Sequence, residues 1–274
     1  MKLQGIFAEI TTPFDHKGDI YKAKVQHNVE KWNRTTLAGY VVCGSAGEGG
    51  MLSSEEKIAV WQMAASFAAN EKLLIAAAGM PGVRETVALA NRAAELGYKA
   101  ALVHSRHPHP EVQLLYFRAV ADQSRIPVIA AGAVPDIARP AAGHPNIIAV
   151  CDRTCSKVLP DIQMLVGSAA HLWPALEAGA SGAILDFAAA APYAAIAIWE
   201  AHRTREHEAG VDWQNRIARA AELVNECHHG VPSLKHAMDL TGYYGGPPRL
   251  PLAVPRPEVK REIEDAFRDL PADR

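Results

Sequence analysis

Short apolar runs alternate with helical segments along the first 186 residues, and this alternation constrains the fold more than any other feature. The runs lack the polar alternation of a half-exposed strand, which is typical of strands buried on both faces of a parallel sheet. Eight such strands separated by helices predict a closed (β/α)8 TIM barrel of class α/β. An open doubly wound sheet stays the alternative, because a count of strands does not show closure. The predicted strands are 3–11, 40–43, 72–78, 99–103, 127–131, 147–151, 164–166 and 183–186.

After residue 186 the pattern becomes wholly helical. We therefore expect residues 1–190 to form the barrel, and residues 191–274 to add the last barrel helix and a C-terminal helical extension within one structural unit. Helices are predicted at 19–34, 54–70, 83–96, 111–124, 157–163 and 171–178 between the strands, and at 193–208, 212–228, 233–241 and 256–269 after them.

Charge and cysteine content narrow the class of function. The 274 residues carry a formal net charge of −2, and no basic cluster is long enough to follow a nucleic acid or an anionic membrane. No secretory or membrane-spanning run is visible, which predicts a cytoplasmic protein. The four cysteines lack paired CxxC spacing, so we expect free thiols and no structural zinc. Small-molecule or protein partners are favoured, and neither a cofactor nor a bound metal is predicted.

A glycine-rich loop follows the predicted strand 40–43. Glycines here allow backbone N–H groups to approach a ligand closely, and the carboxyl end of a parallel strand is where α/β folds bind ligands. We expect the loop to hold a carboxylate or phosphate, although a tight connection with nothing bound stays open. Its candidate ligand-binding residues are Gly44, Ser45, Ala46, Gly47 and Glu48.

Short motifs along nearly the whole chain, in matching order, resemble the dihydrodipicolinate synthase and N-acetylneuraminate lyase family. The resemblance implies a (β/α)8 barrel with three added helices, assembled as a homotetramer or dimer. It further implies class I aldolase or lyase chemistry on pyruvate or a similar 2-oxo acid. The motifs are Gly-Ile-Phe at 5–7, Thr-Thr-Pro-Phe at 11–14, Gly-Ser-Ala-Gly-Glu at 44–48, Pro-Val-Ile at 127–129, Asn-Ile-Ile-Ala-Val at 146–150, Gly-Ala-Ile at 182–184 and the tail 235–252.

In that family a lysine at the end of strand six forms a Schiff base, a tyrosine at the end of strand five transfers protons, and the loop after strand two binds the substrate carboxylate. This sequence departs from the pattern at each place. Cys151 stands at the lysine position, Ala131 at the tyrosine position, and Ala46 replaces the second hydroxyl of the loop. A thiol forms no imine. We therefore expect Schiff-base chemistry to be lost, with a small-carboxylate or 2-oxo acid pocket retained.

An active lyase with an altered mechanism is the alternative. Cys151 and Asp152 would be its catalytic residues, together with the histidine-rich loop from His104 to His109, in which Ser105 and Arg106 would contact an anion. Other interpretations stay open: Cys151 as a packed apolar filler, the histidines as a solvated loop, or a metal-assisted lyase. Neither Lys157 nor Lys235 is in a sequence context that promises a relocated imine lysine.

Overall fold

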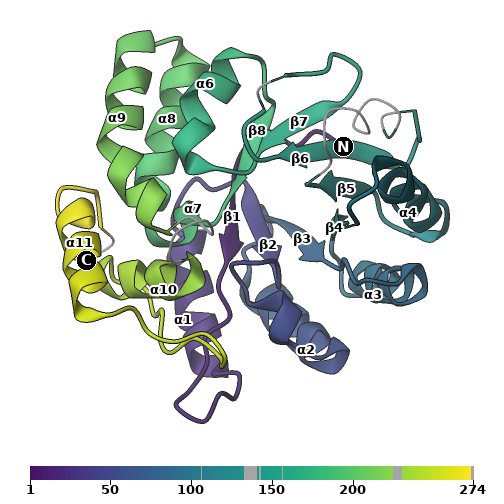
Figure 1. Ribbon diagram of the computed structural model, residues 1–274, viewed down its shortest axis with the longest axis horizontal. Helices are drawn as coiled ribbons and strands as arrows, with labels where there is room; N and C mark the ends of the chain where they lie inside the picture. The colour runs from purple at the N-terminus through teal and green to yellow at the C-terminus, as the bar shows by residue number, and fades with distance from the viewer. Residues whose placement is uncertain (106, 133–140, 142, 156, 225–229, 273–274) are drawn as a thin grey trace.

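The computed structural model describes residues 1–272 except 106, 133–140, 142, 156 and 225–229. Its strands are all parallel and pair in chain order, and β8 closes the sheet by pairing with β1 (Figure 1). Closure confirms the predicted (β/α)8 barrel and excludes the open sheet. The strands are β1 (Gly5–Ile10), β2 (Gly39–Val42), β3 (Leu73–Ala77), β4 (Ala100–His104), β5 (Val128–Ala131), β6 (Ile147–Asp152), β7 (Gln163–Val166) and β8 (Gly182–Leu185).

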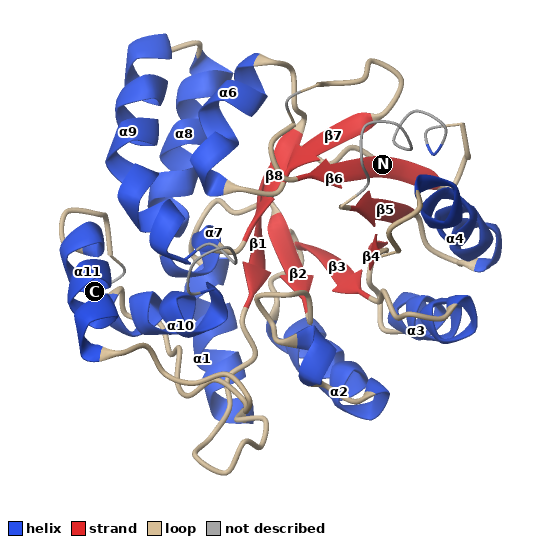
Figure 2. Ribbon diagram, viewed as in Figure 1, coloured by secondary structure: helices blue, strands red, loops and turns tan. Residues whose placement is uncertain are grey.

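Helices surround the barrel and continue into an extension at its C-terminal end (Figure 2). Those that follow the strands are α1 (Lys22–Asn33), α2 (Ser54–Phe67), α3 (Val83–Glu95), α4 (Pro110–Gln123), α6 (Leu172–Glu177), α7 (Phe187–Ala190) and α8 (Pro192–Thr204). The extension contains α9 (His207–Val224), α10 (Gly230–Leu240) and α11 (Pro257–Phe267).

Two local predictions differ from the structure. The helix expected at 157–163 does not form in the described part of that segment, because Pro160 lacks a backbone N–H and disfavours the helical conformation of the residue before it. The short helix α7 was not predicted. It begins at the cap residue Asp186, whose Oδ1 accepts a hydrogen bond from the Phe187 backbone N–H at 2.7 Å.

The barrel interior is filled by one apolar cluster, to which every strand contributes. Its members are Leu3, Phe7, Val41, Ile75, Ala77, Ala100, Leu102, Ile129, Ala131, Ala149, Cys151, Leu165 and Ile184. Side chains alternate along a strand, so Glu9 of β1 lies on the same inner face as Phe7. By the same alternation, His104 of β4 and Gln163 of β7 share this face with Glu9, so the lining is apolar with a few polar side chains.

The extension packs against the side of the barrel where β1 and β8 meet. Helix α8 contacts β1, and α10 contacts both α7 and α11. Trp32 of α1 is buried between these parts: its indole N–H donates to the Ala189 carbonyl at 3.0 Å, and its ring stacks on Tyr243 at 5.5 Å. Among the described helices, none is both long and apolar enough to cross a bilayer.

Candidate functional site at the barrel mouth

The barrel mouth, meaning the end where the strands have their carboxyl termini, is shaped by the loop 44–50 after β2. This loop is tightly closed, because the Gly49 N–H donates to the Gly44 carbonyl at 2.9 Å. It is also strained, since Cys43 and Glu48 adopt positive φ angles of 63° and 56°. A capping box between Ser53 and Glu56 then begins α2. The loop is thus held in a fixed shape next to the strand ends.

The loop binds a carboxylate that belongs to the chain itself. Glu9 Oε1 accepts hydrogen bonds from the Ser45 hydroxyl at 3.0 Å and from the Ala46 backbone N–H at 2.9 Å. Gly44 permits this approach, because a Cβ atom at that position would lie 2.2 Å from Glu9 Oε1. The carboxylate that the loop contacts in this structure is therefore a side chain of the same chain.

Glu48, predicted to bind a ligand, is instead committed to the C-terminal extension. One carboxylate oxygen lies 2.5 Å from Lys235 Nζ of α10, and the other accepts the Arg249 backbone N–H at 2.7 Å. Lys235 also donates to the carbonyls of Thr12 and Pro247. Both charged side chains are buried. Glu48 therefore joins the loop to the extension through both of its carboxylate oxygens.

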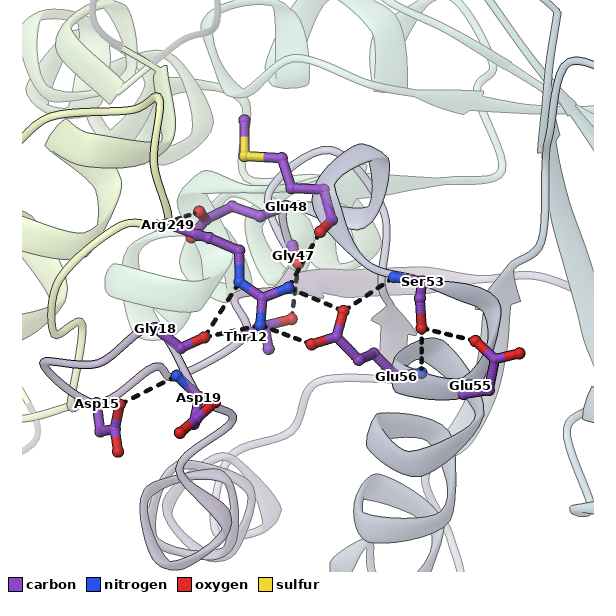
Figure 3. Close-up of polar contacts among 11 residues, drawn as sticks. Thr12, Asp15, Gly18, Asp19, Gly47, Glu48, Ser53, Glu55, Glu56 and Arg249 are labelled. Carbon is purple, nitrogen blue, oxygen red and sulfur yellow. Dashed lines mark hydrogen bonds and ion pairs between the residues drawn. The ribbon is translucent and has the colours of Figure 1, made fainter.

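Arg249 forms a second connection between the loop region and the extension (Figure 3). Its guanidinium donates to both carboxylate oxygens of Glu56, at 2.7 and 2.9 Å, and to the carbonyls of Gly18 and Met51. This bidentate pair holds the pKa of the Glu56 carboxyl below its usual value. The residues Arg249, Glu56 and Glu48 thus fix the outer side of the loop.

At the end of β6, Cys151 faces the interior beside Ala131 of β5, its partner in the parallel register. The thiol is buried, and burial raises its pKa above the ordinary value. The nearby Cys155, Glu9 and Asp152 raise this pKa further. A thiol in such surroundings is protonated at neutral pH, which makes it a poor nucleophile. The geometry favours the interpretation of Cys151 as a packed side chain.

Asp152 is the next residue of β6 and therefore lies on the opposite face of the strand from Cys151. Its Oδ1 accepts hydrogen bonds from the backbone N–H of Thr154 at 3.1 Å and from that of Cys155. These bonds form a local turn after the strand. The arrangement gives Asp152 a structural role in the turn and does not direct this oxygen toward Cys151.

The histidine-rich loop is not one cluster. The His104 ring lies close to the Gly132 backbone at the end of β4, whereas the rings of His107 and His109 pair with each other at 5.4 Å on the surface before α4. Ser105 is buried, and Arg106 lies outside the described residues. Within the described ranges, no three His, Cys, Asp or Glu side chains are grouped closely enough to hold a metal ion.

The buried lysines of the described chain are Lys57, Lys72 and Lys235, and their side-chain contacts are to residues outside the barrel strands. Lys57 Nζ contacts Met80 Sδ at 3.1 Å, Lys72 donates to the carbonyls of Thr35 and Leu37, and Lys235 pairs with Glu48. Lys157 is exposed. None of these contacts involves a residue of the interior apolar cluster.

A separate hollow of about 560 Å³ lies among α6, α8 and the beginning of α9. Trp173, Trp199 and His207 line it, together with Gln4, which directly precedes β1. Because Gln4 lies directly before β1, the hollow is toward the amino end of the strands and away from the loop 44–50. Ligand sites of this fold lie at the other end.

The barrel and its loop have close counterparts among known proteins. The model of the dihydrodipicolinate synthetase family matches residues 2–135, and the 4-hydroxy-tetrahydrodipicolinate synthase of Methanothrix thermoacetophila is 26% identical over 96% of each chain. The chain is thus similar to the dihydrodipicolinate synthetase family over residues 2–135. A probable 4-hydroxy-2-oxoglutarate aldolase of Emericella nidulans, named as mitochondrial, is 28% identical and covers 97% of this chain and 94% of its own.

A solved structure extends the family likeness to three dimensions. The dihydrodipicolinate synthase of Acinetobacter baumannii, complexed with pyruvate, has a TM-score of 0.89 and 24% identity, with 97% of this chain and 98% of the other covered. At this identity the likeness shows the fold. The likeness in fold covers both the barrel and its extension.

Glu9 was not among the site residues predicted from the sequence. Its signal is present: a carboxylate stands in the strand Gly5–Ile10, whose neighbours are apolar, and a charged residue on a buried strand needs a partner. The partner could not be named from sequence, because the donors are on a loop that follows a different strand.

Proposed function

We propose that this chain is a barrel protein of the dihydrodipicolinate synthetase family that has lost class I Schiff-base chemistry and serves as a binding, regulatory or partner subunit. The observation that carries the proposal is the end of β6, where the family resemblance implies an amine and the chain has the buried thiol of Cys151. A thiol forms no iminium ion, which in such lyases withdraws electrons from the substrate.

The neighbouring positions support the same conclusion. Ala131 stands where a phenol would transfer protons, and the loop donors Ser45 and Ala46 are engaged by Glu9. The sequence led us to expect a retained pocket for a small carboxylate. Because Glu9 engages the loop donors, we do not propose that this pocket is open to a free carboxylate. The loop keeps its capacity to bind a carboxylate, and the chain fills it.

The altered lyase built on Cys151, Asp152 and the histidine loop gains no support from the geometry. Burial keeps the Cys151 thiol protonated, Asp152 closes a turn, and the His107 and His109 side chains pair with each other at the surface. Its remaining support is the similarity to relatives named as synthases and as an aldolase.

Cytoplasmic location and self-association as a dimer or tetramer remain part of the proposal. Large apolar side chains are exposed on α4 and on the segment before α11, notably Leu115 at 68% and Leu250 at 82%. Such side chains suit a contact between copies of the chain.

Exchange of the pyruvate methyl protons tests the proposal. Any lyase that forms an enamine or enolate from pyruvate exchanges these protons with solvent, so proton NMR in D2O detects either mechanism. We expect exchange at the rate of the protein-free buffer. The positive control is the Acinetobacter baumannii synthase at the same concentration. Exchange above buffer contradicts the proposal, and its loss in Cys151→Ser would identify the altered lyase.

A further inference from the structure

We propose that the Glu9 carboxylate is the built-in occupant of the anion-binding loop 44–50 and excludes free small carboxylates from the barrel mouth. This inference deepens the proposed function and rests on it, because the proposed function takes the barrel mouth as the end that would face a ligand. Glu9 is then a specificity-determining residue. Its removal would turn a closed loop into a site for a small monocarboxylate.

The hydrogen bonds accepted by Glu9 show that the donors of the loop are already occupied. Two donors of different kinds, the Ser45 hydroxyl and the Ala46 backbone N–H, converge on the single atom Glu9 Oε1 at 3.0 and 2.9 Å. Converging donors of this kind bind an anion strongly. A ligand carboxylate would need the same two donors and would have to displace Glu9 to reach them.

The position of Glu9 and its negative charge both oppose the binding of a second carboxylate. Glu9 Oε1 lies so close to Gly44 that a Cβ atom there would be only 2.2 Å away, so the loop leaves no room for another oxygen at this point. The Glu9 charge also acts on Cys151 across the mouth, raising the pKa of that thiol. A second carboxylate between β1 and β6 would therefore meet a filled loop and a like charge.

The surrounding contacts argue against a purely structural role for Glu9. The loop is already closed by the Gly49 N–H to the Gly44 carbonyl, and Thr12 Oγ1 donates to the Gly47 carbonyl at 2.6 Å. The pair of Glu48 and Lys235 joins the loop to the extension independently. These contacts keep the loop in place without Glu9, so a variant at position 9 should keep its fold.

Titration of the intact protein with sodium pyruvate, followed by saturation-transfer NMR, tests the inference without any reductant. We expect Glu9→Ala to bind pyruvate at least tenfold more tightly than the unmodified chain. Glu9→Gln is the matched control, because its amide oxygen still accepts from both donors and should leave affinity unchanged. The double variant Glu9→Ala with Ser45→Ala should lose most of the gain, since one of the two donors is removed.

Two results would overturn the inference. One is equal pyruvate affinity in the unmodified chain and in a folded Glu9→Ala variant, with folding verified by circular dichroism and thermal midpoint. The other is a gain that survives Ser45→Ala in full, which would locate pyruvate elsewhere. If Glu9→Ala does not fold, Glu9→Ser is judged by the same criterion. Covalent capture on a lysine would contradict the proposed function and leave this comparison of affinities unaffected.

Discussion

Replacing Lys235 by methionine is expected to lower the free energy of unfolding by about 3–5 kcal/mol. The Lys235 and Glu48 side chains are 1% and 0% exposed, and their charged atoms lie 2.5 Å apart. Methionine keeps the apolar stem but leaves the Glu48 charge buried without its cation. It also removes the donors to the Thr12 and Pro247 carbonyls. Urea unfolding followed by circular dichroism measures the loss.

Lys99→Met is the matched control, because the Lys99 side chain is exposed, and we expect a change within about 0.5 kcal/mol. The double variant Lys235→Met with Glu48→Gln should recover part of the loss, since it no longer buries an unpaired charge. A Lys235→Met protein that unfolds within 1 kcal/mol of the unmodified chain, by the same measurement, would show that this pair does not anchor the extension to the loop.

Adjacent glycines in the loop are expected to respond in opposite ways to alanine. A Cβ atom at Gly49 would lie 1.9 Å from the Cys43 carbonyl oxygen, a backbone atom that cannot move without distorting β2, whereas nothing lies within 4 Å of a Cβ at Gly50. Gly49→Ala should therefore destabilise the protein by about 1–3 kcal/mol or more. Gly50→Ala should be neutral or slightly stabilising, because it restricts the unfolded chain.

Thermal midpoints of the two variants, measured side by side, decide this prediction. Both substitutions add one methyl group within the same loop, so any general effect of alanine cancels in the comparison. Equal midpoints would mean that Gly49 is not held against the carbonyl of Cys43, and the fixed shape assigned to the loop would have to be abandoned.

The fold was largely predictable from sequence because the barrel strands are local patterns. The apolar run that became β2 and the glycines after it needed no distant partner to be recognised. The helix predicted at 157–163 was wrong. It was expected from the alternation of strands and helices, although Pro160 opposed it. Closure of the barrel depended on the pairing of β1 with β8, which the family resemblance implied and the register established.

The site was less predictable because its decisive contacts join distant segments. Glu9 of β1 meets Ser45 in the loop after β2, and Glu48 meets Lys235 across 187 positions of sequence. Local patterns marked the loop as a place for a carboxylate but did not show which carboxylate. The direction of each side chain at the end of β6 also needed the register, which sends Cys151 inward and Asp152 outward.

The proposed loss of Schiff-base chemistry involves more than one position. With Cys151 buried, Ala131 beside it and Glu9 in the loop, the changes at β6, β5 and β1 meet at one end of the barrel. The contacts of Glu48, Lys235 and Arg249 keep the loop and extension ordered. This arrangement is consistent with a barrel whose mouth is maintained as a structure while imine chemistry is absent.

Reductive trapping shows whether this chain forms a Schiff base with pyruvate. The protein is incubated with pyruvate and sodium borohydride, and the intact mass and peptide masses are measured, with the Acinetobacter baumannii synthase as positive control. A Schiff base would be reduced to a stable adduct on a lysine. The account predicts an unchanged mass for this chain under conditions that modify the control. A pyruvate adduct on any of its lysines would contradict it.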